Sequence, residues 1–243
     1  MLQEKVALIT GGGTGIGRSI ALRLAKAGAN IVINYSRSEK EAFDTKKEID
    51  GMFQKCLVYR ANIAQDAEVR VMVKRIINDF GRLDILINNA GMTYFIEHND
   101  LEGLKDEHWD QIMDVNVKGM FHCCRAAAKH LKDNNGCIIN IASIAGITGL
   151  GSSIAYAASK AAVINITKSL ARVLAPKVRV NSIAPGVVET RWIEGQDLNK
   201  LASGTLLGRN AYPDEIADVA YALIANAKFV NGQTIVVDGG SII

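Results

Sequence analysis

Long apolar runs and clusters of like charge are both missing from this 243-residue sequence. No apolar stretch approaches the roughly 20 residues that span a bilayer, so no membrane-spanning helix is expected. The formal net charge is only +3, and lysine and arginine are dispersed, which argues against a nucleic-acid-binding surface. The N-terminus lacks the basic flank, apolar core and small-residue cleavage site of a signal peptide, and we therefore expect a cytoplasmic protein.

Cysteine is sparse and irregularly spaced. The four cysteines form no C-x-x-C pair and are too few for the disulfide framework of a secreted domain. His122 and Cys123 are adjacent, but adjacent residues on a helix point in different directions, so we expect no metal site. The favoured interpretation is four buried or half-buried free thiols, at Cys56, Cys123, Cys124 and Cys137.

Proline is scarce too, with three residues in the whole chain. Two of them, Pro185 and Pro213, flank the one long stretch that has no clear strand pattern. A long stretch of this kind inside a compact domain is usually functional. Because ligands of open α/β sheets bind outside the carboxyl ends of the strands, residues 186–212 are predicted to form a substrate loop there.

The sequence does contain a regular alternation of short β-branched runs and longer helical patterns. Continuous apolar strands between helices indicate a parallel sheet covered on both faces. With 49% hydrophobic residues, the chain can bury the core of a single α/β domain over residues 1–243, with a doubly wound, seven-stranded parallel sheet. We expect strands at residues 6–9, 30–33, 55–58, 83–87, 137–141, 178–183 and 234–237, and helices at about 15–28, 38–51, 66–80, 106–132, 155–175 and 213–226.

A glycine-rich turn, TGGGTGIG at residues 10–17, follows the first expected strand and leads directly into a helical pattern. Glycine suits such a turn because it tolerates positive φ and lets the backbone approach a pyrophosphate closely. The free amides at the start of the following helix favour negative charge. The turn therefore predicts a dinucleotide site.

Tyr156 and Lys160 lie four residues apart in a predicted helix, so that they share one face. An ammonium beside a phenol favours the phenolate, and we expect it to lower the tyrosine pKa from its usual value of about 10. Such a pair can act as a proton donor in carbonyl reduction. Taken alone, the spacing is more typical of ordinary surface packing.

Together, these features resemble the short-chain dehydrogenase/reductase family. The glycine spacing T-G-x-x-x-G-x-G, the N-N-A-G segment at 88–91, Asn116, Ser143 thirteen residues before Tyr156, and Pro185-Gly186 all match the family pattern in order. The resemblance covers nearly the whole chain and implies a single-domain Rossmann-type fold. It implies cofactor-binding roles for Gly11, Thr14, Gly15, Ile16, Gly17, Tyr35, Ser36, Arg37, Asn62, Ile63, Asn89, Ala90, Gly91, Tyr156, Lys160, Pro185, Gly186, Val188 and Thr190.

The resemblance also assigns the catalytic roles. Tyr156 would be the general acid in reduction and the general base in oxidation, while Lys160 would lower the Tyr156 pKa and hold the nicotinamide ribose. Ser143 would hydrogen-bond the substrate carbonyl oxygen. Asn116 would bind a water through which Lys160 exchanges protons with solvent. Ordinary structural roles stay open for two of them, because Ser143 could cap a loop and Asn116 could satisfy a buried backbone group.

Residues after the second strand favour NADP(H) over NAD(H). Tyr35 takes the place of the acid that NAD-preferring members of the family usually carry, so no carboxylate there would repel a 2′-phosphate. Ser36 and Arg37 can bond phosphate oxygens, although Arg37 could instead be an ordinary solvated cation. Against this choice, Thr14 stands where many NADP-using members carry a basic residue. Asn62 replaces a common Asp, which weakens its proposed contact with adenine.

Within the family, the chain is most similar to the β-ketoacyl-acyl-carrier-protein reductases, through Asn34-Tyr35 and the closing segments 232–234 and 238–240. The similarity implies a 3-keto thioester substrate and allows an acyl carrier protein as its carrier. A carrier could dock on three cations of the two long helices, although cations on helix faces are more often simply solvated: Lys129, Lys132 and Arg172.

Several alternatives remain open from the sequence. A long segment at 93–108 and a loop bearing Trp192 border the pocket, so another carbonyl, such as a sugar, steroid or quinone-like ketone, is possible. A non-catalytic dinucleotide-binding regulator would not need Tyr156 and Lys160 together. Enoyl reduction would typically show a different Tyr-to-Lys spacing. A homo-oligomer is expected through the helices at 106–132 and 155–175; similar proteins imply a homotetramer, and the sequence leaves a dimer open.

Overall fold

The computed structural model describes residues 2–243, and Met1 lies outside the described residues. Seven parallel strands form one sheet in the order β3-β2-β1-β4-β5-β6-β7, which confirms the predicted α/β architecture. The strands are β1 (Val6–Thr10), β2 (Asn30–Tyr35), β3 (Cys56–Arg60), β4 (Ile85–Asn88), β5 (Cys137–Ile141), β6 (Arg179–Pro185) and β7 (Thr234–Val237).

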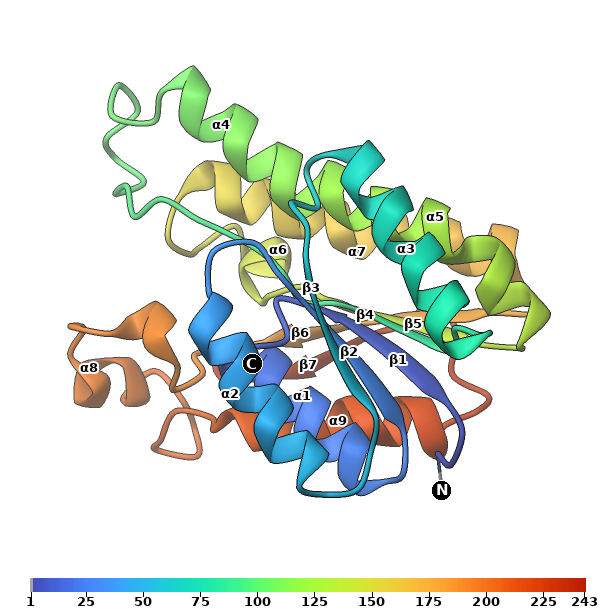
Figure 1. Cartoon of the computed structure of the whole chain (residues 1–243). Coiled ribbons are helices and arrows are strands. Elements are labelled where there is room, and N and C mark those ends of the chain that lie inside the picture. The colour runs from blue at the N-terminus through green and yellow to red at the C-terminus, as the bar shows by residue number, and fades with distance from the viewer. Residues whose placement is uncertain (1) are drawn as a thin grey trace.

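Helices cover both faces of the sheet (Figure 1). On one face lie α1 (Gly15–Lys26), α2 (Glu39–Asp50) and α9 (Pro213–Ala225), and on the other α3 (Asp66–Phe80), α5 (Met120–Asp133) and α7 (Ile154–Leu174). Alternate residues of the strands feed the two cores, as the period of two requires. In β1, for example, Ile9 belongs to the first core and Leu8 to the second.

The strand order reverses at β1, which pairs with β2 on one side and β4 on the other. A reversal of this kind leaves a crevice at the carboxyl ends of the strands, because the connections leave in opposite directions. The carboxyl end of β1 runs into the glycine-rich turn before α1, and the N-N-A-G segment follows β4. The fold thus brings the two motifs to the same place.

The expected helix at 106–132 is not one α-helix. It consists of α4 (Asp106–Met113), a π-helical segment η1 (Asp114–Gly119) and α5. Such π segments are often found at functional sites, and this one contains Asn116. Hydrophobic periodicity did not reveal the change because one wider turn hardly disturbs the pattern of buried positions.

The predicted substrate loop contains two short helical elements that were not expected, η2 (Arg191–Ile193) and α8 (Leu198–Ala202). A further short helix, α6 (Ala145–Thr148), precedes α7. In Figure 1, α8 projects beyond the sheet on the side of the carboxyl ends of the strands. A parallel bridge between Val188 and Ala211 joins the two ends of the loop.

All four cysteines are free and buried, as expected. Burial raises the pKa of the Cys56 and Cys124 thiols to about 12, which leaves them protonated and unreactive. Across residues 2–243, no group of three or more His, Cys, Asp or Glu side chains is placed to hold a metal ion. None of the described helices has the length and apolar character needed to cross a bilayer.

Candidate active site

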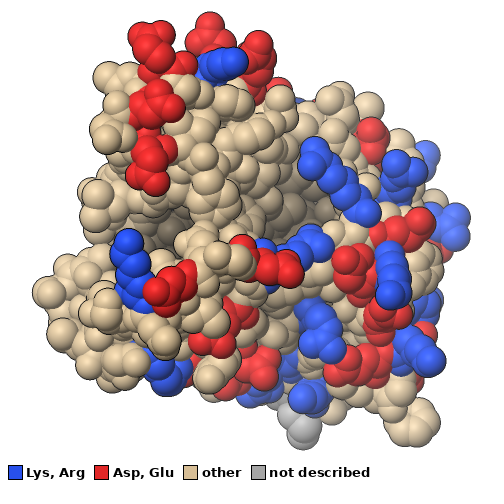
Figure 2. Space-filling model, turned by 90° about the vertical axis from the view of Figure 1, so that its left-hand side faces the viewer, with Lys and Arg blue, Asp and Glu red and all other residues tan. Residues whose placement is uncertain are grey.

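A cleft of about 1150 Å³ opens at the carboxyl ends of the strands. Figure 2 shows it as a deep hollow in this face of the molecule. Its wall contains most of the residues predicted to bind cofactor or substrate, drawn from segments more than a hundred residues apart in the sequence. Two of the predicted residues, Gly17 and Asn116, do not line the cleft but lie behind its wall.

The glycine-rich turn lines the cleft at the carboxyl end of β1. Gly11 and Gly15 have φ of +62° and +51°, a conformation that other residues adopt only with strain. At Gly17, an added Cβ would lie 2.4 Å from both Asn89 Nδ2 and the Gly11 carbonyl oxygen. The turn therefore needs glycine at these positions, and it leaves the first amides of α1 facing the cleft.

Partly buried hydrogen bonds fix the N-N-A-G segment against this turn. Asn89 Nδ2 donates to the carbonyl oxygens of Thr10 and Gly11 at 3.0 and 3.1 Å. The Thr10 hydroxyl in turn accepts from the amides of Asn89 and Ala90 at 3.0 and 3.1 Å. These contacts lock the ends of β1 and β4 together, so that Ala90 and Gly91 form a rigid part of the wall.

A second buried chain of hydrogen bonds extends this wall toward α7. Asn88 Nδ2 donates to Asn140 Oδ1 at 2.8 Å, and Asn140 Nδ2 donates to the Thr167 hydroxyl at 2.9 Å. Asn140 and Thr167 are fully buried. The sequence analysis missed both residues, although a polar residue within the apolar run at 137–141 was the available signal.

At the expected adenosine end of the cleft, the Tyr35 hydroxyl donates to Glu39 at 2.5 Å. This hydrogen bond raises the pKa of the Tyr35 phenol. Ser36 and Arg37 are exposed at the rim of the cleft. Asn62 Oδ1 accepts from the Ala64 amide at 3.1 Å, so part of this side chain is used to shape its own turn. Glu39 was not expected from the sequence.

The start of α7 positions the predicted proton donor. Ser153 caps this helix by accepting from the Tyr156 amide at 3.3 Å, and Tyr156 is half-buried in the cleft wall. Lys160, one turn further, is 5% exposed, and its ammonium lies 5.6 Å from the centroid of the Tyr156 ring. The predicted stacking of the two side chains on one helix face is therefore present.

The expected lowering of the Tyr156 pKa is not found in this structure. Burial raises that pKa to about 12, and only a hydrogen bond involving Ser143 acts in the opposite direction. The Lys160 ammonium donates to the Ile141 carbonyl oxygen at 2.8 Å, and its own burial lowers the Lys160 pKa to about 8. Desolvation is the largest cause of both shifts, because Lys160 is buried and the half-buried Tyr156 is surrounded by protein groups in the cleft wall.

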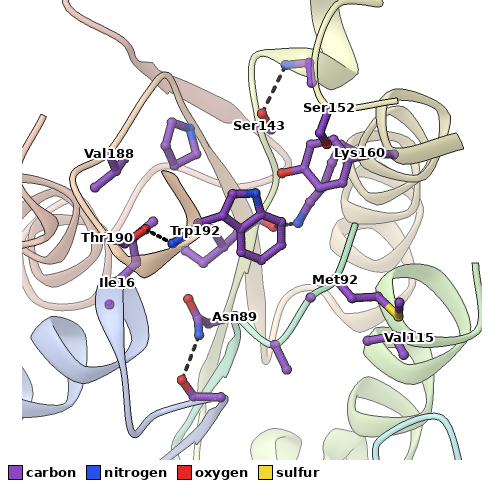
Figure 3. A pocket seen from close by; sticks show the side chains of 18 of the residues that line it. Ile16, Asn89, Met92, Val115, Ser143, Ser152, Lys160, Val188, Thr190 and Trp192 are labelled. Atoms are coloured by element: carbon purple, nitrogen blue, oxygen red, sulfur yellow. Dashed lines mark hydrogen bonds between the residues drawn. The ribbon is translucent and has the colours of Figure 1, made fainter. Parts of the chain in front are cut away.

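Ser143 follows β5 and faces the same space. Its hydroxyl accepts from the Ala145 amide at 3.1 Å, so it does stabilise its own turn, as the structural alternative proposed. Ser143, Tyr156 and Lys160 nevertheless all line the cleft. Figure 3 shows Ser143 and Lys160 around one part of the cavity, with Thr190 and Val188 across from them. This convergence leaves room for a carbonyl group between a hydroxyl and a phenol.

Asn116 in η1 connects three parts of the site. Its amide oxygen accepts from the Met92 amide at 2.8 Å, and its nitrogen donates to the Met92 carbonyl oxygen and the Ser159 hydroxyl at 2.9 and 3.0 Å. These contacts support the alternative in which Asn116 satisfies buried backbone groups. Ser159 precedes Lys160, so the same contacts also brace the lysine. A water relay through Asn116 stays a prediction.

The substrate loop supplies the opposite wall of the cleft. The Trp192 ring lies 6.0 Å from the Tyr156 ring between centroids, at a tilt of 50°. Figure 3 shows the Trp192 indole projecting into the cavity between Thr190 and Lys160. Apolar residues complete this end of the cleft: Met92, Phe95, Ile96, Leu150 and Ile193.

The segment before α4 forms the upper rim of the cleft. Thr93 and Ser152 share a hydrogen bond of 2.6 Å, and a His98 ring nitrogen lies 3.1 Å from the Gly151 carbonyl oxygen. The rim is acidic, as Figure 2 also shows, and its exposed carboxylates are those of Glu97, Asp100, Glu102, Asp106 and Glu107.

The chain is similar to known proteins over nearly its whole length. A family model described as enoyl-(acyl carrier protein) reductase matches residues 11–241. A 3-oxoacyl-(acyl-carrier-protein) reductase, FabG of Staphylococcus aureus, is 39% identical over 99% of both chains.

Solved structures agree with this similarity. A short-chain dehydrogenase of Burkholderia cenocepacia, in complex with NADP, is 34% identical with a TM-score of 0.92, covering 100% of this chain and 99% of that one. A dehydrogenase/reductase of Sinorhizobium meliloti is 32% identical with a TM-score of 0.93, covering 100% and 96%.

Proposed function

The chain belongs to the short-chain dehydrogenase/reductase family, and we propose that it is an NADP(H)-dependent oxidoreductase that reduces the ketone of a 3-ketoacyl thioester. The observation that carries this proposal is the convergence of Ser143, Tyr156 and Lys160 in one cleft that also contains a phosphate-binding turn. The name of the Staphylococcus aureus relative supports the substrate class.

The cofactor fits the residues that line the cleft. Gly11 and Gly15 give the turn the shape that a pyrophosphate needs, and the amides at the start of α1 face the cleft. Tyr35 brings no carboxylate of its own to the adenosine ribose, and Arg37 is an exposed cation at the rim. The Burkholderia cenocepacia relative was solved with NADP, which supports NADP(H) here.

The reaction then divides between the cofactor and three side chains. NADPH, when bound, supplies the hydride that adds to the carbonyl carbon. The Ser143 hydroxyl donates a hydrogen bond to the carbonyl oxygen, and Tyr156 transfers its phenolic proton to that oxygen. A phenol with a pKa of about 12 is fully protonated at neutral pH, which is the form that reduction requires. Lys160, mostly charged at pH 7, stabilises the phenolate left behind.

The decisive experiment is the Tyr156→Phe variant. We expect it to lose ketone reduction by more than about a thousandfold while it binds NADPH as the wild type does, because only the proton donor is removed. Reduction is followed by NADPH absorbance and binding by NADPH fluorescence. A variant that kept full activity would refute the assignment, and a wild type that binds NADPH but reduces no carbonyl would favour a non-catalytic regulator.

A substrate panel separates the remaining alternatives. Acetoacetyl thioester should be reduced with higher kcat/KM than sugar, steroid or quinone carbonyls. A 2-enoyl thioester belongs in the same panel, because the matched family model carries an enoyl reductase description. Faster turnover of the enoyl thioester than of the keto thioester would replace the proposed reaction by enoyl reduction.

A carrier-bound substrate is a further part of the panel. Lys129, Lys132 and Arg172 are exposed but lie near the C-terminal ends of α5 and α7. Arg172 is about 24 Å along α7 from Tyr156, given a rise of about 1.5 Å per residue. The part of the rim formed by residues 93–107 is acidic and would repel an acidic carrier that approached there. Comparing free with carrier-bound acetoacetyl groups tests whether a carrier is used.

Assembly and location complete the proposal. On α7, Ala158 and Ala161 are small and exposed, and Phe121 on α5 is 40% exposed, which suits close packing against a second subunit. We propose a homotetramer in which these helices meet, and light scattering in solution tests it. A cytoplasmic location is part of the same proposal.

A further inference from the structure

Arg191 crosses the cofactor cleft from the substrate loop to the start of α2. Its Nη2 donates to the Ser38 hydroxyl at 2.8 Å, and its Nη1 lies 3.4 Å from a carboxylate oxygen of Glu41. The three residues come from opposite walls of the cleft, 150 or more positions apart in the sequence. Arg191 is thus a link between the loop and the adenosine end of the cleft.

Arg191 lies where it could supply a positive charge that the glycine-rich turn of the cofactor site lacks. The glycine-rich turn carries Thr14, so it contributes no cation. The loop passes directly over that turn, because a Cβ on Gly15 would lie 3.2 Å from Thr190 Cγ2. Ser38 directly follows Arg37, and both line the cleft with Arg191. The Arg191 guanidinium therefore lies beside the place where a 2′-phosphate would meet Arg37.

We propose that Arg191 couples the 2′-phosphate of NADP(H) to closure of the substrate loop, by leaving Glu41 to bind that phosphate together with Arg37. The inference rests on the proposed use of NADP(H). It assigns to the loop a cation that recognises the cofactor, and it makes closure of the loop depend on which dinucleotide is bound.

Moving the Arg191 guanidinium from Glu41 to a phosphate requires little free energy. The Arg191 and Glu41 side chains are 55% and 46% exposed, and an ion pair this exposed contributes little. A phosphate monoester carries about −1.5 to −2 charges at pH 7 and accepts a guanidinium in a two-pronged geometry.

The coupling follows from the next residue in the chain. Arg191 and Trp192 belong to the same short helical turn, η2, and Trp192 packs against the Tyr156 ring. A phosphate that holds Arg191 consequently holds Trp192 over the catalytic tyrosine. NAD(H), which has no 2′-phosphate, leaves Arg191 on Glu41 and the loop less firmly held. By linkage, binding of a ketone under Trp192 raises the affinity for NADPH more than the affinity for NADH.

Fragments of the cofactor test the contact directly. Calorimetry compares 2′,5′-ADP, which carries the 2′-phosphate, with ADP, which carries the pyrophosphate instead, on the full-length protein. Arg191→Met should lower the affinity for 2′,5′-ADP by about tenfold and the affinity for ADP by less than about twofold, because one charge-assisted contact with the 2′-phosphate is lost. Arg191→Lys should recover part of the loss. Lys200→Met, which removes an exposed cation from the same loop, should change neither.

Trp192 reports the coupling. The part of the tryptophan fluorescence that is lost in Trp192→Phe comes from Trp192. In the wild type, this emission should shift when 2′,5′-ADP binds. The shift should be absent in Arg191→Met. An equal loss of affinity for both fragments in Arg191→Met would indicate that Arg191 binds the pyrophosphate, and it would overturn the proposal. An unchanged 2′,5′-ADP affinity in Arg191→Met would overturn it too. If wild type bound 2′,5′-ADP no better than 5′-AMP, the NADP(H) assignment itself would fail.

Discussion

The two walls of the cleft are built on different physical principles. At the ends of β1, β4 and β5, buried polar side chains bond one another and the backbone, and Thr10 and Asn140 are fully buried. In the described substrate loop, by contrast, η2 and α8 carry no buried residue. The proton donor and the phosphate-binding turn lie on the first wall, and Arg191 and Trp192 on the second.

This difference separates what must be rigid from what can adapt. A buried hydrogen bond is costly to break because its donor and acceptor cannot form hydrogen bonds with water instead. The first wall therefore keeps its geometry. Segments held by exposed contacts open at little cost and are where binding specificity commonly resides. We therefore expect the fixed wall to carry the proposed chemistry and the movable wall to govern substrate selection.

The largest expected effect comes from breaking the fixed wall at Gly17. In Gly17→Ala, the new Cβ would meet Asn89 Nδ2 and the Gly11 carbonyl oxygen at 2.4 Å. We expect loss of NADPH binding and a fall of about 2 to 3 kcal/mol in the free energy of unfolding, as for other overpacked sites. NADPH titration and urea denaturation measure the two effects.

The movable wall offers a matched control for this change. At Gly204 an added Cβ would contact only the Leu201 carbonyl oxygen, at 3.5 Å. Gly204→Ala should therefore alter the free energy of unfolding by less than about 0.5 kcal/mol. Equal destabilisation by the two alanines would contradict the contrast between the walls.

Next in size is the effect of removing the buried charge at Lys160. Lys160→Met should abolish reduction yet raise the free energy of unfolding at pH 7 by about 1 to 3 kcal/mol, because burying the ammonium is costly. Burial lowers the folded-state pKa of Lys160 from 10.5 to about 8, so below pH 8 the wild type carries the full penalty. Between about pH 8 and 10.5 the folded protein loses this proton first, and wild-type stability rises relative to the variant.

Urea denaturation across this pH range measures the advantage of the variant, which should shrink as the pH rises. Lys129→Met is the control, since it removes an exposed cation from α5 and should show no such pH dependence. If Lys160→Met were less stable than wild type at pH 7, the hydrogen bond to the Ile141 carbonyl oxygen would outweigh the desolvation cost, and our account of this lysine would be wrong.

The smallest effect on stability is expected at Trp192. Trp192→Ala removes a 40% exposed side chain and should leave the free energy of unfolding within about 0.5 kcal/mol of wild type. Its effect should appear in substrate selection instead. The preference in kcat/KM for a long 3-ketoacyl thioester over a short one should fall about tenfold, because apolar contact is lost.

Steady-state kinetics with short and long thioesters provide the measurement, and Phe229→Ala, at an exposed phenylalanine in the turn between α9 and β7, is the control. A proportional loss of kcat with both substrates would instead mean that Trp192 holds Tyr156 in position. In that case the movable wall would take part in the chemistry, and the separation drawn above would fail.

Much of the fixed wall could be predicted from local patterns. The strand runs, the glycine-rich turn and the spacing from Tyr156 to Lys160 each depend on residues near one another in the chain, and the structure brings them together in the cleft. The π-helical segment at Asn116 was not predicted, and the residues to which Asn116 bonds, Met92 and Ser159, are distant in sequence. The direction of the Tyr156 pKa was also wrong, since spacing alone does not reveal burial.

By itself, then, the sequence predicted the order of strands and helices, the glycine-rich turn and a candidate proton donor. Those features follow from periodicity and from residue chemistry over a few neighbouring positions. Only the tertiary structure decided which groups lose contact with water and which distant residues meet, as Arg191 meets Ser38. Desolvation and long-range contact depend on the packing of the whole chain, and no short stretch of sequence contains them.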